Sequence, residues 1–296
     1  MNRPESFRGE FRVGASLSDY TSWRIGGCAE YLAEPVDQAD LCALLEGTPV
    51  GLPVLFIGRG SNLLVRDGGV RGLVVCLDGK LAEITEQAEE CIEAEAGIAS
   101  ARVAHYATQR GLAGAEFLAG IPGTLGGALA MNAGAFGGET WAVVSEVKVV
   151  DRQGNSRWRT PEAYQIAYRQ VSGPADEWFV AARLQLTRMD RPTVQARVKA
   201  LMSQRSATQP VKLPTAGSVF RNPPDDHAAR LIEATGLKGY CIGDASVSEQ
   251  HANFIVNQGQ ARAADIERLI AYVADRVEER HGIRLQPEVH VVGEAA

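Results

Sequence analysis

The chain has 296 residues, of which 45% are hydrophobic and 22% charged, the composition of an ordinary globular protein with room for two domains. Thirty Lys and Arg against 36 Asp and Glu give a formal net charge of −6, and no basic block interrupts this balance. Nucleic acid and anionic membranes are therefore poor candidate partners, so local Arg, Lys and main-chain groups must meet any anionic ligand.

The N-terminal segment has no apolar core of the kind found in secretory signals, and no run of about eighteen apolar residues marks a membrane span. We therefore expect a cytoplasmic protein. No C-x-x-C pair or Cys/His cluster is present, so neither a metal site nor a disulfide framework is predicted. We expect five buried, reduced thiols, those of Cys28, Cys42, Cys76, Cys91 and Cys241.

In the first half of the chain, hydrophobic periodicity and turn residues predict helices and short strands. The expected helices are 36–45, with Asp37 as its cap, and 100–109, which Gly111 ends. The expected strands are 53–57, 72–77, a hairpin pair over 84–96, 143–150 with a hairpin around 152–155, and 178–186.

The second half contains more helix. The expected elements are helices 194–205, 228–235 and 263–281, a strand over 254–257 and a last strand around 287–292. A domain boundary near Arg191 and Pro192 would divide the chain into residues 1–190, split again near 72–76, and residues 191–296, whose last strand could return to the first domain. Strands and helices mixed with hairpins indicate an α+β fold.

Residues 119–138 contain seven Gly and five Ala in twenty positions. Residues without bulky side chains let main-chain N–H groups approach a ligand, and they tolerate positive φ. Thr124 is placed to cap a helix over 125–131, and a helix N-terminus attracts phosphate. Close packing of a helix on a strand also selects Gly and Ala, and this alternative stays open.

A second glycine-rich loop, Gly58 to Asn62, follows an expected strand. It is neither G-x-G-x-x-G nor a P-loop. The functional interpretation is a tight turn whose N–H groups, with Ser61 and Asn62, bind a pyrophosphate. The alternative is a turn that only makes local hydrogen bonds. Two such loops together point to a large anionic cofactor.

The chain resembles the UDP-N-acetylenolpyruvoylglucosamine reductase family over roughly residues 20 to 293. The motifs that carry the resemblance are 20–27 (YTSWRIGG), 57–64 (IGRGSNLL), 120–123 (GIPG) through 132–135 (NAGA), Tyr168-Arg169, 216–223 (AGSVFRNP), 237–239 (LKG), 251–257 (HANFIVN) and 287–289 (PEV). It is similar to the shorter, second type of the family, because no tyrosine-bearing insertion follows Arg169. The segment after Arg169 departs from the family's usual serine-rich continuation.

This resemblance implies a two-subdomain FAD-binding domain of the vanillyl-alcohol-oxidase (PCMH) type over 1–190, followed by a smaller α+β substrate-binding domain over 191–296. It also implies reduction, by NADPH through FAD, of the enolpyruvyl ether of UDP-N-acetylglucosamine to UDP-N-acetylmuramate. That reaction belongs to peptidoglycan precursor synthesis, and so to cell-wall biogenesis, cell shape and cell division. The implied partner is a small-molecule substrate, and no oligomer is implied.

The resemblance also assigns residues to FAD. These cofactor-binding residues are Arg24, Gly58, Arg59, Gly60, Ser61, Asn62, Leu63, Gly120, Ile121, Pro122, Gly123, Gly126, Gly127, Asn132, Gly134 and Ala135. Trp23 is a further candidate to line the flavin pocket, although an aromatic side chain there is also consistent with packing.

Three residues are expected to be catalytic. Ser218 takes the family's role of proton donor to the α-carbon, for which it needs hydrogen-bond reach. Arg169 can meet the substrate carboxylate with two N–H groups, and this contact strengthens as enolate charge develops. Glu288 is expected to act beside Arg169, either protonated or by polarising a donor. Without the resemblance, each has an ordinary structural explanation as a turn residue, a surface cation or a strand-edge carboxylate.

The expected substrate-binding residues are Tyr168, Arg205, Asn222, Lys238 and His251, with Gln209 beside Arg205 near the diphosphate. His251 has a structural alternative, because lone histidines are often satisfied within a fold. Two other functions remain as alternatives. One is an oxidase of the same FAD fold, and the other is a module that binds a nucleotide sugar or flavin without turnover.

Overall fold

The computed structural model describes all 296 residues and confirms the α+β fold. The chain divides into two compact units, each built from segments that are separate in sequence. The first contains residues 1–12, 31–59 and 72–204, and the second contains 13–30, 60–71 and 205–296. The sequence placed one boundary near residue 190, whereas contacts group 13–30 and 60–71 with the C-terminal residues.

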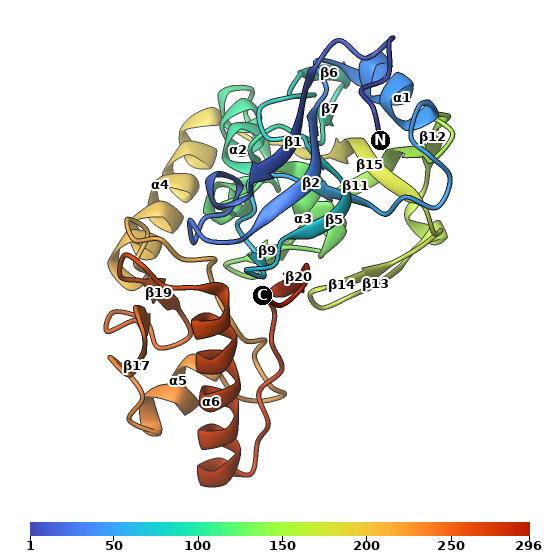
Figure 1. Cartoon of the computed structure of the whole chain (residues 1–296). Helices are drawn as coiled ribbons and strands as arrows, with labels where there is room; N and C mark the ends of the chain where they lie inside the picture. Colours follow the sequence, from blue (N-terminus) through green and yellow to red (C-terminus); the bar gives the residue numbers. More distant parts are fainter. The chain divides into compact units, whose positions relative to one another are not determined.

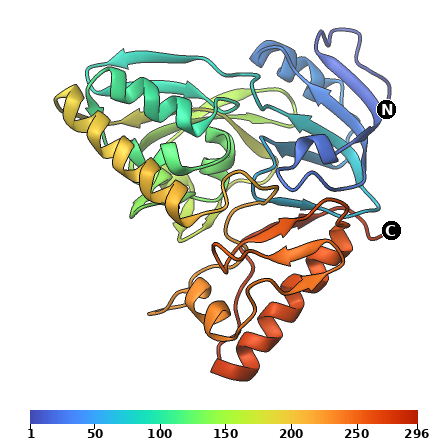
Figure 2. The ribbon, with the colours of Figure 1, turned by 90° about the vertical axis from the view of Figure 1, so that its left-hand side faces the viewer.

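The first unit is centred on a five-stranded antiparallel sheet, in which β11 pairs with both β12 and β15. In spatial order its strands are β12 (Ser156–Arg159), β11 (Val144–Asp151), β15 (Glu177–Gln185), β7 (Cys91–Glu95) and β6 (Ile84–Ala88). Helix α3 (Leu125–Ala130) contacts β7 and β15, and α2 (Ser100–Gln109) contacts α3. Figure 2 shows both helices beside this sheet, in green. Their core includes Leu125, Leu129 and Leu184.

A four-stranded sheet has the order β1 (Glu10–Ser16), β2 (Cys28–Glu34), β5 (Val70–Cys76), β3 (Val54–Ile57), and β3 runs parallel to β5. Helix α1 (Gln38–Glu46) buries Leu41 and Leu44 in the same cluster as Leu73 and Val75 of β5. The sequence did not predict β1. Five of its seven residues are exposed, so it carries no alternation of buried and exposed positions.

Shorter elements complete the first unit. They are η2 (Glu116–Gly120), η3 (Thr140–Ala142), η4 (Pro161–Ala163) and the strand pairs β8 (Leu112–Ala113) with β16 (Thr187–Arg188), β9 (Gly134–Ala135) with β10 (Gly138–Glu139), and β13 (Gln165–Ala167) with β14 (Gln170–Ser172). Helix α4 (Arg191–Thr208) is longer than the expected 194–205 and buries only Val194. Because α4 has no apolar face, hydrophobic periodicity did not predict its bounds accurately.

The second unit has a three-stranded antiparallel sheet and two helices. Its elements are η1 (Ser18–Tyr20), β4 (Leu63–Val65), α5 (Ala228–Ala234), β17 (Cys241–Ile242), β18 (Ala245–Val247), β19 (Ile255–Asn257), α6 (Ala263–His281) and β20 (His290–Val292). Helix α6 packs against α5, β17 and β18 (Figure 1). Strand β20 runs parallel to β4, so the end of the chain returns to a segment that follows the first glycine-rich loop.

Helices with visible start and stop residues were predicted well. Helix α6 has its expected bounds, and α2 ends where Gly111 adopts φ +63°. The cap of α1 is also confirmed, because the Asp37 carboxylate accepts a hydrogen bond from the Asp40 N–H at 2.8 Å. The last strand is shorter than expected, since Pro287 makes only an isolated bridge with Phe220 and the paired strand begins at His290.

The expectation of five buried thiols is wrong. All five cysteines are unpaired, but only Cys76 is buried, and Cys28 and Cys241 are exposed. Cys28 is the first residue of β2. Successive side chains of a strand point to opposite faces, so Cys28 lies on the exposed face and Ala29 on the buried one. Burial raises the pKa of the Cys76 thiol to about 11, so this sulfur stays protonated at neutral pH.

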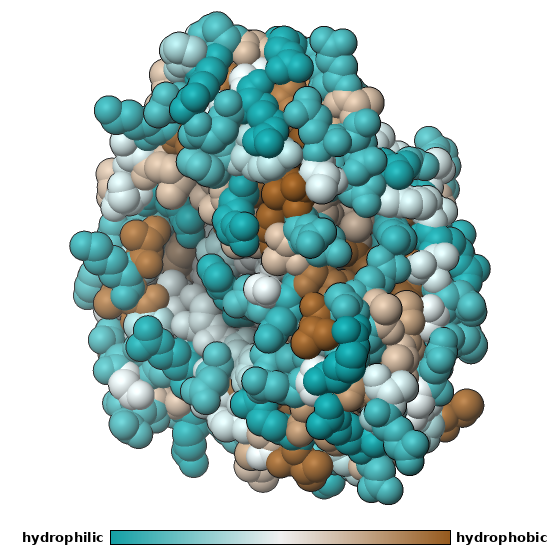
Figure 3. Space-filling view, turned by 90° about the horizontal axis from the view of Figure 1, so that it is seen from above, coloured by the Kyte–Doolittle hydropathy of each residue, from teal (hydrophilic) through white to brown (hydrophobic).

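No helix is long and apolar enough to cross a membrane, and no cluster of three or more His, Cys, Asp or Glu side chains could hold a metal ion. The face seen in Figure 3 is mostly hydrophilic, with its apolar side chains in separate small groups.

Candidate active site

The two glycine-rich stretches meet within the first unit. A Cβ atom added to Gly58 would lie 2.2 Å from the Thr124 hydroxyl oxygen, so no larger residue fits there. Thr124 also caps α3, since its hydroxyl oxygen accepts a hydrogen bond from the Gly127 N–H at 3.4 Å. The loop after β3 and the start of α3 are therefore one local structure, as a shared ligand requires.

The glycines of the second stretch have different roles. A Cβ at Gly120 would meet the Phe136 ring at 2.6 Å, and one at Gly126 would meet the Ala96 Cβ at 3.0 Å, so both positions serve close packing. At Gly127 the nearest atom would be the Thr124 hydroxyl oxygen at 3.7 Å, so this position is open. Packing therefore explains part of the glycine content, and Gly127 is left for close approach by a ligand.

Arg169 is held against the end of the same stretch. Its guanidinium donates to the carbonyl oxygens of Gly134 at 2.7 Å and Asn132 at 3.3 Å, and it lies 4.8 Å from the centre of the Tyr168 ring. The backbone of Arg169 has φ +54°, a region that non-glycine residues rarely adopt. An outlier at an expected anion-binding residue is consistent with a functional constraint.

The Asn132 side chain is occupied by the protein. Its amide donates to the Glu139 carboxylate at 3.0 Å and to the Ala167 carbonyl at 3.2 Å, and it accepts from the Trp141 N–H at 3.1 Å. Both donors are thereby used. Asn132 fixes the turn that carries Gly134, so a contact of this residue with a cofactor would come through its main chain.

The first glycine-rich loop passes from the first unit to the second between Arg59 and Gly60. Gly60 has φ +59°, and a Cβ there would lie 2.0 Å from the Tyr20 carbonyl oxygen. The N–H groups of Gly60 and Ser61 donate no hydrogen bond within the protein. Main-chain donors left unused in a left-handed turn suit phosphate oxygens, so the loop fits a phosphate-bearing cofactor.

Ser218 and Glu288 lie on adjacent segments of the second unit. The Glu288 N–H donates to the Val219 carbonyl oxygen at 2.7 Å, and Phe220 bridges Pro287. Gly217, with φ +75°, turns the chain just before Ser218. The Ser218 hydroxyl is half-buried and makes no hydrogen bond within the protein. The structure therefore brings two of the three expected catalytic residues together and leaves the hydroxyl available to a ligand.

Asn62 joins the first glycine-rich loop to this pair, because its side-chain amide donates to the Glu288 carbonyl oxygen at 3.1 Å. This contact connects positions 226 apart in sequence. One expected cofactor residue thus holds the main chain of an expected catalytic residue.

Lys238 and His251 also lie close together in the second unit. Burial is the main cause that lowers the pKa of His251, and the Lys238 charge adds to it. His251 Nδ1 accepts a hydrogen bond from the Asn253 N–H at 3.3 Å, and Lys238 pairs with Glu233 at 3.3 Å. A neutral imidazole beside an ammonium group is suited to polar and anionic parts of a nucleotide sugar.

Arg205 is a half-buried cation whose Nε donates to the side-chain oxygen Oε1 of Gln209 at 3.3 Å, and burial lowers the pKa of its guanidinium. A desolvated cation without a carboxylate partner is suited to an anionic ligand. Asn222, in contrast, is used locally, since its side-chain oxygen accepts from the Ala228 N–H at the start of α5.

Other expected residues are placed as follows. Trp23 is fully buried and donates to the Ile255 carbonyl oxygen, so it is a core residue. Arg59 pairs with Asp78 at 3.3 Å, and Arg24 is exposed with φ +59°. Leu63 begins β4, Ala135 ends β9, and the half-buried Ile121 and Gly123 flank the exposed Pro122 before Thr124.

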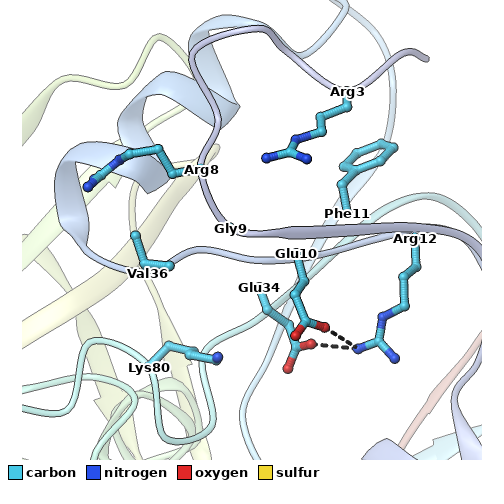
Figure 4. Close-up of a pocket in the computed structure, with 9 residues that line it drawn as sticks. All are labelled: Arg3, Arg8, Gly9, Glu10, Phe11, Arg12, Glu34, Val36 and Lys80. Carbon is cyan, nitrogen blue, oxygen red and sulfur yellow. Dashed lines mark hydrogen bonds and ion pairs between the residues drawn. The ribbon is translucent and has the colours of Figure 1, made fainter.

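A pocket of about 430 Å³ in the first unit is lined by none of these residues (Figure 4). Its charged side chains are largely paired with one another or with the chain. Arg12 contacts Glu34 at 2.5 Å and Glu10 at 3.5 Å, and the Arg3 guanidinium donates to the Phe7 carbonyl. This pocket has neither the glycine loops nor the catalytic side chains, so we do not regard it as the active site.

Comparisons with known proteins match two parts of the chain to protein families. Residues 29–158 match the FAD binding domain family, and residues 209–292 match the C-terminal domain family of UDP-N-acetylenolpyruvoylglucosamine reductase. The chain is 59% identical to the reductase of that name from Alkalilimnicola ehrlichii, covering 97% of this chain and 96% of the relative. It is 56% identical to the one from Methylococcus capsulatus, covering 97% and 95%.

Among solved structures, the chain is similar to the crystal structure of UDP-N-acetylenolpyruvylglucosamine reductase (MurB) from Thermus caldophilus. The TM-score is 0.78 at 33% identity, covering 96% of this chain and 98% of that one.

Proposed function

This chain belongs to the UDP-N-acetylenolpyruvoylglucosamine reductase family, and from that premise we propose how its residues carry out the reaction. It is an FAD-containing oxidoreductase that reduces the enolpyruvyl ether of UDP-N-acetylglucosamine to UDP-N-acetylmuramate in peptidoglycan synthesis, with NADPH as hydride donor. The expected fold, an FAD-binding domain followed by the reductase's own C-terminal domain, is confirmed. Neither an oxidase nor a binding module is consistent with this family.

We propose that FAD phosphates are held by the N–H groups of Gly60 and Ser61. Within the first unit, the open main chain at Gly127 is a separate proposed place for close approach by the cofactor. The support is the pair of unused donors in a left-handed turn, and the contact that joins Gly58 to Thr124. When bound and reduced by NADPH, the flavin supplies the hydride.

Ser218 is the proposed acid that protonates the substrate's α-carbon. The observation that carries this assignment is a half-buried hydroxyl without a protein partner, on a segment hydrogen-bonded to the one that holds Glu288. We further propose that Arg169 binds the substrate carboxylate and stabilises enolate charge, and that Glu288 acts in the same step, either protonated or by polarising a donor. Arg205, Lys238 and His251 are the proposed contacts of the UDP-sugar. Because nucleotide sugars and NADPH are cytoplasmic metabolites, the proposed location is the cytoplasm.

The test is Ser218→Ala, with the two half-reactions followed by flavin absorbance. We expect bleaching by NADPH to stay within about twofold, and reoxidation by the enolpyruvyl substrate to slow by about 10²–10⁴-fold, the usual contribution of an acid catalyst. Ser145→Ala, which removes a half-buried hydroxyl bonded to the Arg183 carbonyl, is the control and should keep both rates. Full reoxidation in the Ser218 variant would contradict the assignment.

A further inference from the structure

The segment that carries Ser218 is bonded on one side to the segment that carries Glu288. Phe220 and Pro287 form an antiparallel bridge, in which the Glu288 N–H donates to Val219 at 2.7 Å and the Arg221 N–H donates to Gln286 at 2.9 Å. In this geometry the N–H and C=O of Phe220 point away from Pro287. Phe220 is only 2% exposed, so both groups need a partner on the other side.

A single side chain supplies both partners. The Asn253 side-chain oxygen accepts from the Phe220 N–H at 2.9 Å, and its amide nitrogen donates to the Phe220 carbonyl at 2.8 Å. The main-chain carbonyl of Asn253 accepts from the Val219 N–H at 2.9 Å. Asn253 therefore takes the place of a third strand beside the segment that follows Ser218.

Asn253 is itself held firmly. It is 4% exposed, and its own N–H donates to the Nδ1 atom of His251. The Asn253 amide binds both the N–H and the C=O of Phe220, so it fixes the position and the rotation of the two peptide units that flank this residue, which a single hydrogen bond does not do.

We propose that Asn253 is a positioning residue for the reduction step. Its side-chain amide locks Phe220, and so holds Ser218 in place beside the Glu288 segment. This inference rests on the proposed role of Ser218. The expected consequence of losing the lock is a displaced hydroxyl, and a displacement of about 1 Å can slow a reaction about 10²-fold without loss of binding.

The experiment compares Asn253→Ala with Asn257→Ala in the FAD-loaded full-length enzyme. Asn257 is a matched control, because it is 5% exposed and its side chain also makes three main-chain hydrogen bonds, to Trp23, Gly259 and Ala261. None of these is on the Ser218 segment. Both variants are expected to lose thermal stability.

The readout is reoxidation of the reduced flavin over a range of enolpyruvyl substrate concentrations. For Asn253→Ala, the limiting rate should fall by about 10²-fold while the apparent dissociation constant of the substrate stays within about threefold. For Asn257→Ala, the limiting rate should stay close to that of the unmodified enzyme. Bleaching by NADPH should be unchanged in both.

Asn253→Asp keeps the shape of the side chain and adds a second readout, the pH dependence of the limiting rate. A purely structural role of Asn253 would not change this pH dependence. The ionised carboxylate would repel the Phe220 carbonyl, whereas the protonated acid can donate to it again. Burial raises the pKa of such a group. The limiting rate of this variant, divided by that of the unmodified enzyme, should therefore rise as the pH falls from about 8 to about 6.

The proposal requires both the lower limiting rate of Asn253→Ala and the pH dependence of Asn253→Asp. Equal limiting rates in Asn253→Ala and Asn257→Ala would overturn the proposal, and so would a ratio for Asn253→Asp that does not change with pH. If Asn253→Ala does not fold, the pH dependence of Asn253→Asp decides alone. Failure of the unmodified enzyme to be reoxidised by the substrate would instead contradict the proposed function.

Discussion

Several side chains expected to face a ligand are used first to organise the protein. The Asn132 amide holds Glu139, Ala167 and Trp141, and the Arg169 guanidinium holds the carbonyls of Asn132 and Gly134. These bonds fix the turn at the end of the second glycine-rich stretch. Arg169 therefore has two roles, since it orders this turn and carries the charge proposed to meet the substrate carboxylate.

Replacing Arg169 by Lys tests these two roles together. Lysine keeps the charge but has no fork of donors, so it cannot hold a carbonyl and a carboxylate in fixed geometry. We expect reoxidation by the enolpyruvyl substrate to slow by about 10²-fold or more, measured by the stopped-flow absorbance of the flavin. Bleaching by NADPH should change far less.

Arg183→Lys is the control for that experiment. Arg183 lies on β15 of the same unit and also makes charged hydrogen bonds, to Glu93 and Glu146. Its replacement should lower stability slightly and leave both half-reactions intact. Equal loss of activity in the two variants would argue that Arg169 acts only through the fold.

The sequence suggests candidates for the reacting groups, but not the residues that hold those candidates in place. Ser218, Arg169 and Glu288 carry recognisable chemistry in recognisable motifs. Asn253 was seen only as part of a motif, because its role depends on the polar groups of Phe220, which lies 33 positions away. No local pattern reports such a pairing. The one available signal was a polar side chain within an otherwise apolar run, residues 252–256 (ANFIV).

The helices were predictable because particular residue types cap or stop them and so mark their ends in the sequence. Asp37 and Gly111 mark helix ends that the structure reproduces. Strand partners were not predictable, because pairing joins distant segments, as where β7 pairs with β15. Loops lie between these cases. The glycine content of 58–62 was read as ligand approach, yet at Gly58 and Gly60 the protein's own backbone and side chains also exclude a Cβ.

Gly60→Ala tests whether this loop holds the flavin. The substitution forces a Cβ to within 2.0 Å of the Tyr20 carbonyl and places alanine at φ +59°. The loop must shift, which moves the N–H groups of residues 60 and 61. We expect the FAD dissociation constant, measured by absorbance titration of the apoprotein, to rise by at least about tenfold, or about 1.4 kcal/mol.

Gly79→Ala is the control that separates the effect of backbone strain from the effect of moving the loop at Gly60. Gly79 has φ +71°, but nothing lies within 4 Å of an added Cβ. Its replacement carries a similar backbone penalty, about 1–2 kcal/mol of stability, without displacing the first glycine-rich loop. Unchanged FAD affinity in Gly60→Ala, or equal weakening in both variants, would count against the loop as a phosphate site.

The start of α6 makes stability depend on pH. The Asp265 carboxylate accepts from the Arg262 N–H at 3.0 Å, and this bond is the main cause that lowers the pKa of the carboxyl. Because the folded pKa is lowered, the added stability is present above the usual value of about 3.9 and is lost as the pH falls through the folded pKa.

Asp265→Asn should therefore lower the free energy of unfolding in urea by about 1 kcal/mol at pH near 7. The difference from the unmodified protein should shrink as the pH falls toward about 2. Glu279→Gln, which alters an exposed pair with Arg276 on the same helix, should show a much smaller difference. If the difference in free energy of unfolding between Asp265→Asn and the unmodified protein stayed constant with pH, this account would be disproved.

At the scale of the whole molecule, each unit is assembled from segments far apart in the chain. The clearest case is the C-terminus. Strand β20 runs parallel to β4, which starts directly after the first glycine-rich loop, and the His290 N–H donates to the Asn62 carbonyl at 3.1 Å. The last residues thus support a loop near position 60. Sequence gave only a last strand around 287–292 and the suggestion that it returns to the first domain.

Deleting residues 290–296 tests this support. The deletion removes strand β20, and so its pairing with β4, together with four main-chain hydrogen bonds outside that pairing, in which residues 62, 66, 68 and 69 are bonded to residues 290, 292 and 294. At about 1 kcal/mol each, the loss of these four bonds alone should cost about 4 kcal/mol of stability, seen as a lower unfolding temperature. Because Asn62 and β4 would lose their partner, FAD affinity should fall as well, by at least about tenfold. Deleting only residues 295 and 296 keeps all four bonds and should change neither quantity. If the longer deletion left FAD affinity intact, the loop would have to be held by its own local contacts, such as those of Gly60 with residues 20 to 22.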